Sequence, residues 1–151
     1  MKELKVQPIK DGTVIDHISA GQALKVLRIL KIPESTSSIV SVVLNVKSRI
    51  GKKDIVKIEN RELDTSEVDR ISLIAPKATI NIIRNYDVAK KHVVKLPEEV
   101  YGIIQCSNPT CISNAEKEPV KSRFLVTNKD PLKVRCYYCE REPDDIAERI
   151  S

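Results

Sequence analysis

Four cysteines, the only ones in the chain, form two short-spaced pairs in its last third. Four residues separate Cys106 from Cys111. Two residues separate Cys136 from Cys139, and 24 residues lie between the pairs. Two such pairs, brought together by a hairpin, offer four thiolates to a tetrahedral ion, which is the coordination of zinc in closed structural sites. Because sulfur fills all four positions, no place remains for a reacting water, and we expect one Zn²⁺ ion with a structural role.

Disulfide bonds are the alternative use of these cysteines, and they require an oxidising compartment. The amino-terminal run at residues 1–5 lacks the apolar core of a signal peptide, so we expect no export and a cytoplasmic location. Disulfides do occur inside the cells of some hyperthermophiles, and the Ile, Lys and Glu content is of the kind found in heat-adapted proteins. The sequence therefore favours zinc and leaves the disulfide alternative open.

Charge divides the chain into two unlike parts. Residues 1–97 hold 18 Lys and Arg against 11 Asp and Glu, whereas residues 98–151 hold 8 against 10. We expect two domains with this boundary. The basic first domain favours an anionic ligand, whereas the acidic cysteine domain argues against a nucleic-acid partner. A domain as small as the second buries little apolar surface, for which a structural metal compensates. No run of about 18 apolar residues occurs, so we expect no membrane association.

Two lysines of the first domain could act together. Lys57 and Lys91 lie at or just after predicted strands of one sheet, so both ammonium groups could reach one concave surface and hold phosphate oxygens. With only 4 Gly in the chain, no glycine-rich phosphate loop exists. Side chains would therefore hold a phosphate loosely, which suits a sensor better than a phosphoryl-transfer enzyme. Taken alone, such lysines are more often solvated than functional.

Hydrophobic periodicity predicts the elements that position these residues. After a short strand at 3–9, we expect a strand at 13–18, a helix from 20 to Pro33, strands at 39–46 and 55–59, a helix from 64 to Pro76 and a strand at 78–83. This order is that of the split βαβ, or ferredoxin-like, arrangement, an antiparallel sheet with two helices on one face. The fold class is therefore α+β, and a small zinc-bound β domain with strands at 123–127 and 132–138 follows.

Local signals add detail to these elements. Ser19 with Gln22 matches a capping box, and Asp64 with Glu67 marks the start of the second helix. The strand at 39–46 is nearly all apolar, which predicts burial on both faces, and residues 47–54 read as a hairpin loop. Residues 98–105 read as a short helix or turn that leads to the first cysteine.

Six stretches of the chain together form a more specific pattern: Gly12-Thr13-Val14-Ile15-Asp16-His17-Ile18, Lys53-Asp54-Ile55-Val56-Lys57-Ile58-Glu59-Asn60, Ala75-Pro76-Lys77-Ala78-Thr79-Ile80-Asn81, Asn85-Tyr86, Cys111-Ile112-Ser113 and Cys136-Tyr137-Tyr138-Cys139-Glu140. Their order and spacing run from one end of the chain to the other. In these stretches the whole chain resembles the regulatory chain of aspartate carbamoyltransferase.

The resemblance implies a non-catalytic subunit of pyrimidine biosynthesis. An allosteric domain would bind ATP or CTP, and a zinc domain would dock on the catalytic chains. A regulatory-chain homodimer within the hetero-oligomer is expected from the apolar strand at 39–46. The implied nucleotide site consists of Pro8, Ile9, Val14, Asp16, His17, Lys57, Asn81, Ile83, Tyr86, Val88 and Lys91.

The resemblance also implies roles within this site. Lys91 and His17 would meet the phosphates, Asp16 and Lys57 would lie near the ribose, and backbone around Ile9 and Tyr86 would read the amino group of the base. Pro8 and Lys90 depart from the small residue and the glycine expected at their positions.

Two other functions stay open on the residues alone. A zinc-ribbon protein that binds nucleic acid would account for the cysteines and the net charge of +5, but the acidic cysteine domain and the 3% aromatic content disfavour it. A small phosphate-handling enzyme on a ferredoxin-like sheet, such as an acylphosphatase, would need the glycine-rich anion loop that is missing. Neither Asp16-His17 nor the cysteines belong to a nucleophile pattern.

Overall fold

The computed structural model describes residues 8–49, 51–117 and 120–150 and divides the chain into two compact units. One unit ends at Lys95 and the other begins at Leu96, two residues before the boundary expected from composition. The strand expected at 3–9 lies outside the described residues except for Pro8 and Ile9, which are not in a strand.

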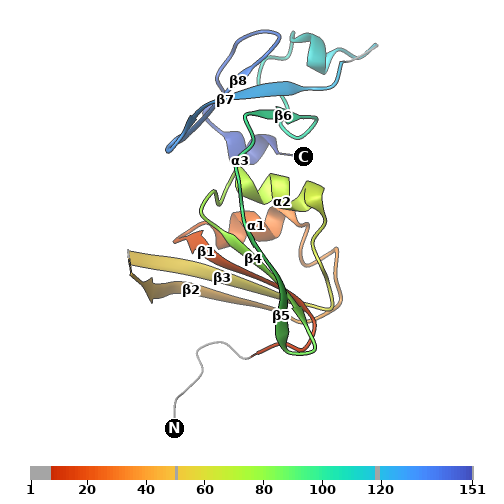
Figure 1. Cartoon of the computed structure of the whole chain (residues 1–151). Coiled ribbons are helices and arrows are strands. Elements are labelled where there is room, and N and C mark those ends of the chain that lie inside the picture. Colours follow the sequence, from red (N-terminus) through yellow and green to blue (C-terminus); the bar gives the residue numbers. More distant parts are fainter. Residues whose placement is uncertain (1–7, 50, 118–119, 151) are drawn as a thin grey trace. The chain divides into compact units, whose positions relative to one another are not determined.

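The first unit is a five-stranded antiparallel sheet with two helices. Its elements are β1 (Gly12–Ser19), α1 (Ala23–Ile29), β2 (Val40–Ser48), β3 (Gly51–Glu59), α2 (Thr65–Ser72), β4 (Thr79–Arg84) and β5 (Asp87–Val93). The strands lie in the order β2-β3-β1-β4-β5, and both helices cover the same face of the sheet (Figure 1). The predicted α+β class with antiparallel sheets is confirmed, and β5 extends the predicted sheet at one edge.

The core lies between the helices and this face of the sheet. Ile15 of β1 pairs with Val56 of β3 and with Ile80 of β4, and all three side chains are buried with Val26 of α1 and Ile71 of α2. Because successive side chains of a strand point to opposite faces, the neighbours of these residues project from the face that carries no helix. That face carries the candidate ligand site.

The two predicted helix starts have different outcomes. Asp64 is the N-cap of α2: its Oδ1 accepts a hydrogen bond from the Glu67 amide at 2.8 Å, and Glu67 Oε1 accepts one from the Asp64 amide at 3.2 Å. The capping box predicted at Ser19 is wrong. Gln22 is the N-cap of α1 without a side-chain hydrogen bond, and its amide donates to the Ser19 carbonyl in a turn.

Three other local predictions are also wrong. β2 is an edge strand in which no residue is fully buried, although it was expected to be buried on both faces. Residues 47–54, expected as a loop, largely continue the hairpin of β2 and β3, whose final pair is Ser48 with Gly51. Residues 98–105, expected as a short helix or turn, contain a short strand, β6 (Glu99–Tyr101).

The second unit is built on a three-stranded sheet. β6, β7 (Arg123–Lys129) and β8 (Leu132–Cys136) are neighbours in that order, and they are accompanied by a 3-10 turn at Ile112–Asn114 and by α3 (Ile146–Arg149). Phe124 is fully buried and pairs with Val100, and Val100, Ile104 and Val134 are also buried. None of the helices in the described residues has the length and apolar character that a bilayer-spanning segment needs.

Candidate functional site: a thiolate cluster and a sheet cavity

The four cysteine sulfurs converge in the second unit. All four lie within 4.8 Å of one another, with 3.5 Å between Cys106 and Cys139 and 3.7 Å between Cys111 and Cys136. A tetrahedral zinc with Zn–S bonds of about 2.3 Å separates its sulfurs by about 3.8 Å. The donor set and its spacing therefore fit one zinc ion.

The local structure explains why the sulfurs meet. Cys136 ends β8 and is fully buried, while Cys139 lies in the turn that follows. Across the site, Cys106 and Cys111 flank a knuckle in which the Asn108 amide donates to the Cys106 sulfur at 3.5 Å. The short loops place both sulfurs of each pair on the same side, as a chelating pair requires.

The thiols differ in how readily they ionise. Burial raises the pKa of the Cys106 thiol to about 12, and burial likewise raises the pKa of Cys136. Burial also opposes ionisation of Cys139, but hydrogen bonds from the Arg141 backbone and from the side chains of Cys106, Asn108 and Cys136 together lower the pKa of Cys139 to about 7. A zinc ion binds thiolates, so its binding at neutral pH releases protons from the buried thiols.

A cavity of about 310 Å³ opens on the helix-free face of the first unit. Eight residues line it, and all eight are among the eleven positions that the resemblance implies: Pro8, Ile9, Val14, Lys57, Asn81, Ile83, Tyr86 and Val88. They come from β1, β3, β4, β5, the β4–β5 turn and the segment before β1. Residues far apart in sequence thus form one hollow.

Strand register explains this convergence. Val14 of β1 pairs with Lys57 on one side and with Asn81 on the other, and Asn81 pairs with Lys91 of β5. Residues in register on antiparallel neighbours share a face of the sheet. These four side chains therefore form a row across four strands. Lys91 stands at the exposed end of the row and does not line the cavity.

Lys57 is the cation at the bottom of this hollow. Its side chain is buried, with 9% of its surface exposed. Burial lowers the pKa of the Lys57 ammonium from its ordinary value of 10.5, and the neighbouring Glu59 carboxylate offsets this only in part. An ammonium that has lost part of its hydration gains more from an anionic partner than a fully hydrated one does.

Asp16 and His17 lie outside the cavity, at the irregular end of β1. His17 has a left-handed backbone, with φ of 58°, and its half-exposed ring places Nδ1 3.2 Å from the Thr79 hydroxyl. Asp16 forms an ion pair with Lys53, with 3.0 Å between Nζ and Oδ1. Sequence reasoning did not single out Lys53 or Thr79, because their proximity depends on the pairing of β1 with β3 and β4.

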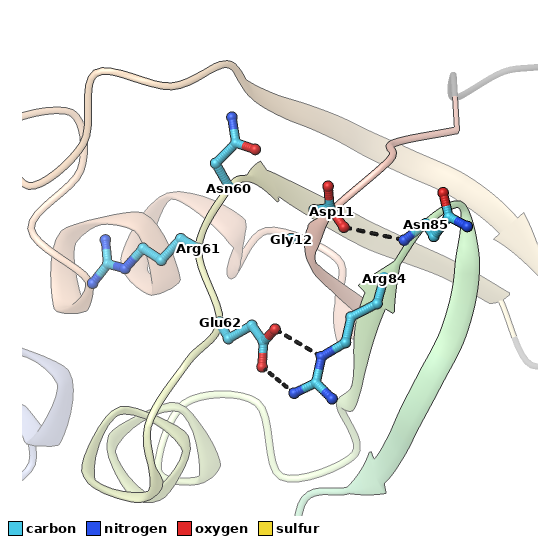
Figure 2. Close-up of a pocket in the computed structure, with 7 residues that line it drawn as sticks. All are labelled: Asp11, Gly12, Asn60, Arg61, Glu62, Arg84 and Asn85. Carbon is cyan, nitrogen blue, oxygen red and sulfur yellow. Dashed lines mark hydrogen bonds and ion pairs between the residues drawn. The ribbon is translucent and has the colours of Figure 1, made fainter.

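A second cavity, of about 470 Å³, lies at the end of the same strands (Figure 2). Its walls carry both charges: Arg84 donates two hydrogen bonds to Glu62, at 2.9 and 2.7 Å, and the Asn85 amide donates to Asp11 Oδ1 at 3.1 Å. Sequence reasoning did not anticipate this cluster, since Arg84 and Glu62 are 22 residues apart and nothing local pairs them.

Comparison with known proteins bears on both units. Residues 4–95 match the family model of the aspartate carbamoyltransferase regulatory chain, allosteric domain, and residues 98–147 match that of the metal binding domain of the same chain. The chain belongs to the aspartate carbamoyltransferase regulatory chain family. Three relatives carrying that name illustrate the similarity. Those of Methanothrix thermoacetophila and Methanothermobacter thermautotrophicus are 55% and 56% identical, over 99% and 98% of this chain and 96% of each relative. That of Methanoculleus marisnigri is 58% identical over 97% of this chain and 94% of the relative.

Membership of this family decides between the functions that the residues alone left open. The chain is a regulatory chain with an allosteric and a metal-binding domain, and it is not a catalytic subunit. Its metal-binding domain takes one structural zinc, and the four converging cysteines supply a donor set that can hold it. The zinc-ribbon nucleic-acid protein and the acylphosphatase-like enzyme are thereby set aside.

Proposed function

We propose that this chain senses ATP and CTP for aspartate carbamoyltransferase in the cytoplasm, within pyrimidine biosynthesis. The nucleotide occupies the 310 Å³ cavity, and the zinc unit docks on the catalytic chains. The observation that carries the proposal is the gathering of eight implied site residues around one hollow with a buried lysine inside it. The volume lies at the lower end of the range of ligand pockets, about 300–1,000 Å³.

The chemistry of the cavity suits an aminated base and an anionic tail. The Tyr86 amide already donates to the Lys10 carbonyl at 2.8 Å, so Tyr86 offers a ligand only its own carbonyl from the main chain. A carbonyl accepts from the exocyclic amino group that adenine and cytosine share. Lys57 would then meet the ribose side of the nucleotide, while Lys91 and His17 would take the phosphates and Asp16 would lie near the ribose.

The two departures from the family pattern have different consequences. Lys90 pairs with Ile82, one position from the pair of Lys91 with Asn81, so alternation directs Lys90 to the opposite face of the sheet. Lys90 therefore does not disturb the row of side chains that ends at Lys91. Pro8 does line the cavity, and it offers a carbonyl but no N–H. A ligand can use Pro8 only as an acceptor.

Signal transfer follows from unequal affinity. A nucleotide that binds better to one arrangement of the assembly shifts the population toward that arrangement. The coupling free energy between two such sites is typically about 1–3 kcal/mol. Zinc acts indirectly by maintaining the docking surface. We also propose that the regulatory chains pair through the edge strand β2, where Leu44 is half exposed and Ile39, just before the strand, is two-thirds exposed.

Titration calorimetry of the zinc-loaded chain with ATP and CTP, followed by mixing with catalytic trimers, tests the proposal. We expect saturable binding of both nucleotides, no turnover by the chain alone, and a nucleotide-dependent change in aspartate saturation once catalytic chains are added. Assembly that persists unchanged after complete zinc removal contradicts the proposed docking role. A chain that binds neither nucleotide contradicts the sensor role.

A further inference from the structure

The turn between β4 and β5 has an unfavourable backbone. Asn85 and Tyr86 both have left-handed conformations, with φ of 53° and 68°. Such values suit glycine, are tolerated by Asn, and are disfavoured for a bulky aromatic residue. The surrounding structure must therefore hold this turn in place.

The segment just before β1 supplies the restraint. The Tyr86 amide donates to the Lys10 carbonyl at 2.8 Å. The neighbouring Asn85 amide donates to Asp11 Oδ1 at 3.1 Å (Figure 2). Asp11 is itself held in place, because its main-chain carbonyl accepts a hydrogen bond from the Asn60 amide at 2.9 Å. Both amides of the left-handed turn are thus held from the same short segment.

The turn contributes one residue to each of the two cavities. Tyr86 lines the 310 Å³ cavity, whereas Asp11 and Asn85 line the 470 Å³ cavity. The Asp11 carboxylate lies outside the proposed nucleotide site, but it holds a residue adjacent to Tyr86. A substitution at Asp11 would therefore alter nucleotide affinity by changing the position of the turn that carries Tyr86.

We propose that Asp11 is a positioning residue for nucleotide binding: its carboxylate holds the Asn85–Tyr86 turn so that the Tyr86 ring and carbonyl face the nucleotide. This inference rests on the proposed function of the 310 Å³ cavity. Asp11 acts as a hydrogen-bond acceptor and not through its charge. Its negative charge by itself would disfavour an anionic ligand, so removal of charge and removal of the acceptor have opposite effects on affinity.

Two substitutions separate these effects in the full, zinc-loaded chain. Asp11→Asn removes the charge and keeps a carbonyl oxygen for the Asn85 amide, whereas Asp11→Ala removes both. Glu34→Ala is the matched control, because Glu34 is an exposed carboxylate that lines neither cavity. One experiment measures ATP affinity by calorimetry at fixed ionic strength. The other measures hydrogen exchange of the Asn85 and Tyr86 amides by NMR without nucleotide.

We expect Asp11→Ala to bind ATP roughly 3- to 10-fold more weakly than Asp11→Asn, the range that loss of one hydrogen bond produces. Exchange of both amides should accelerate in Asp11→Ala and stay slow in Asp11→Asn and Glu34→Ala. Unchanged exchange in Asp11→Ala overturns the restraint itself. Accelerated exchange with equal ATP affinities in the two variants overturns the positioning role. If the unsubstituted chain binds no ATP but Asp11→Ala still accelerates exchange of the Asn85 and Tyr86 amides, the proposed function fails and the restraint of the turn is supported.

Discussion

Replacing Lys57 with methionine should weaken the proposed nucleotide binding and remove a pH-dependent cost of folding. Methionine keeps the length and apolar stem of the lysine and removes its charge. Burial lowers the pKa of Lys57 below 10.5, so folding disfavours the charged form. That cost is present at neutral pH and disappears as the pH rises above the unfolded value of about 10.5. The unfolding midpoint of Lys57→Met, relative to that of the unsubstituted chain, should therefore be higher at pH 7 than at pH 10.5.

The loss of affinity follows from the same burial. A hydrogen bond to a charged group contributes about 1.5–3 kcal/mol, so removing the ammonium should weaken nucleotide binding roughly 10- to 150-fold. Titration calorimetry measures the affinity, and thermal unfolding between pH 7 and pH 10.5 measures the stability. Lys25→Met is the matched control, because Lys25 is an exposed residue of α1.

Three results would contradict these expectations. Affinity within about twofold of the unsubstituted chain would show that Lys57 does not meet the ligand. A difference in unfolding midpoint between the two chains that stays the same from pH 7 to pH 10.5 would show that folding does not disfavour the charged form of Lys57. Equal effects of Lys57→Met and Lys25→Met would mean that net charge, and not burial, governs both measurements.

Three further predictions concern stability. Chelation of zinc at neutral pH should unfold the cysteine unit while amide NMR signals of the first unit persist; a cysteine unit that keeps its dispersed signals would show that zinc does not maintain it. Asp54→Ala should destabilise the first unit by about 3 kcal/mol or more in urea unfolding, because the buried Asp54 carboxylate accepts from the amides of Gly21, Ala23 and Asn45 at 3.0–3.2 Å. Asp54→Asn, which keeps one acceptor, should cost less, and equal losses would exclude this explanation. Asp64→Ala should cost about 1 kcal/mol through loss of the α2 cap, whereas Asp64→Asn should be nearly neutral in thermal unfolding.

Local chemistry with strict geometric requirements could be predicted from the sequence. The spacing of the cysteines was sufficient because a tetrahedral ion accepts few arrangements of two chelating pairs. The Asp64–Glu67 box was also sufficient, because every partner lies within one turn. The order of strands and helices could be predicted from hydrophobic periodicity, because each helix and most strands of the sheet bury one side against the core.

Features that depend on long-range pairing could not be predicted in this way. The apolar composition of β2 suggested burial on both faces, but its place at the sheet edge is decided by pairing with β3 alone. β5 has exposed side chains throughout and no apolar alternation, so only its hydrogen bonds to β4 make it a strand. The Lys53–Asp16 ion pair joins residues 37 positions apart across an irregular part of β1.

The order of the zinc ligands along the chain has a consequence for synthesis. Every residue of the first unit precedes Cys106, so that unit can fold while the ribosome is still translating the second. The first cysteine pair must then wait for Cys136 and Cys139, on the order of seconds at ordinary elongation rates. In a cell short of zinc, each finished polypeptide would retain one folded half and one open half, and the open half would be the part exposed to proteases.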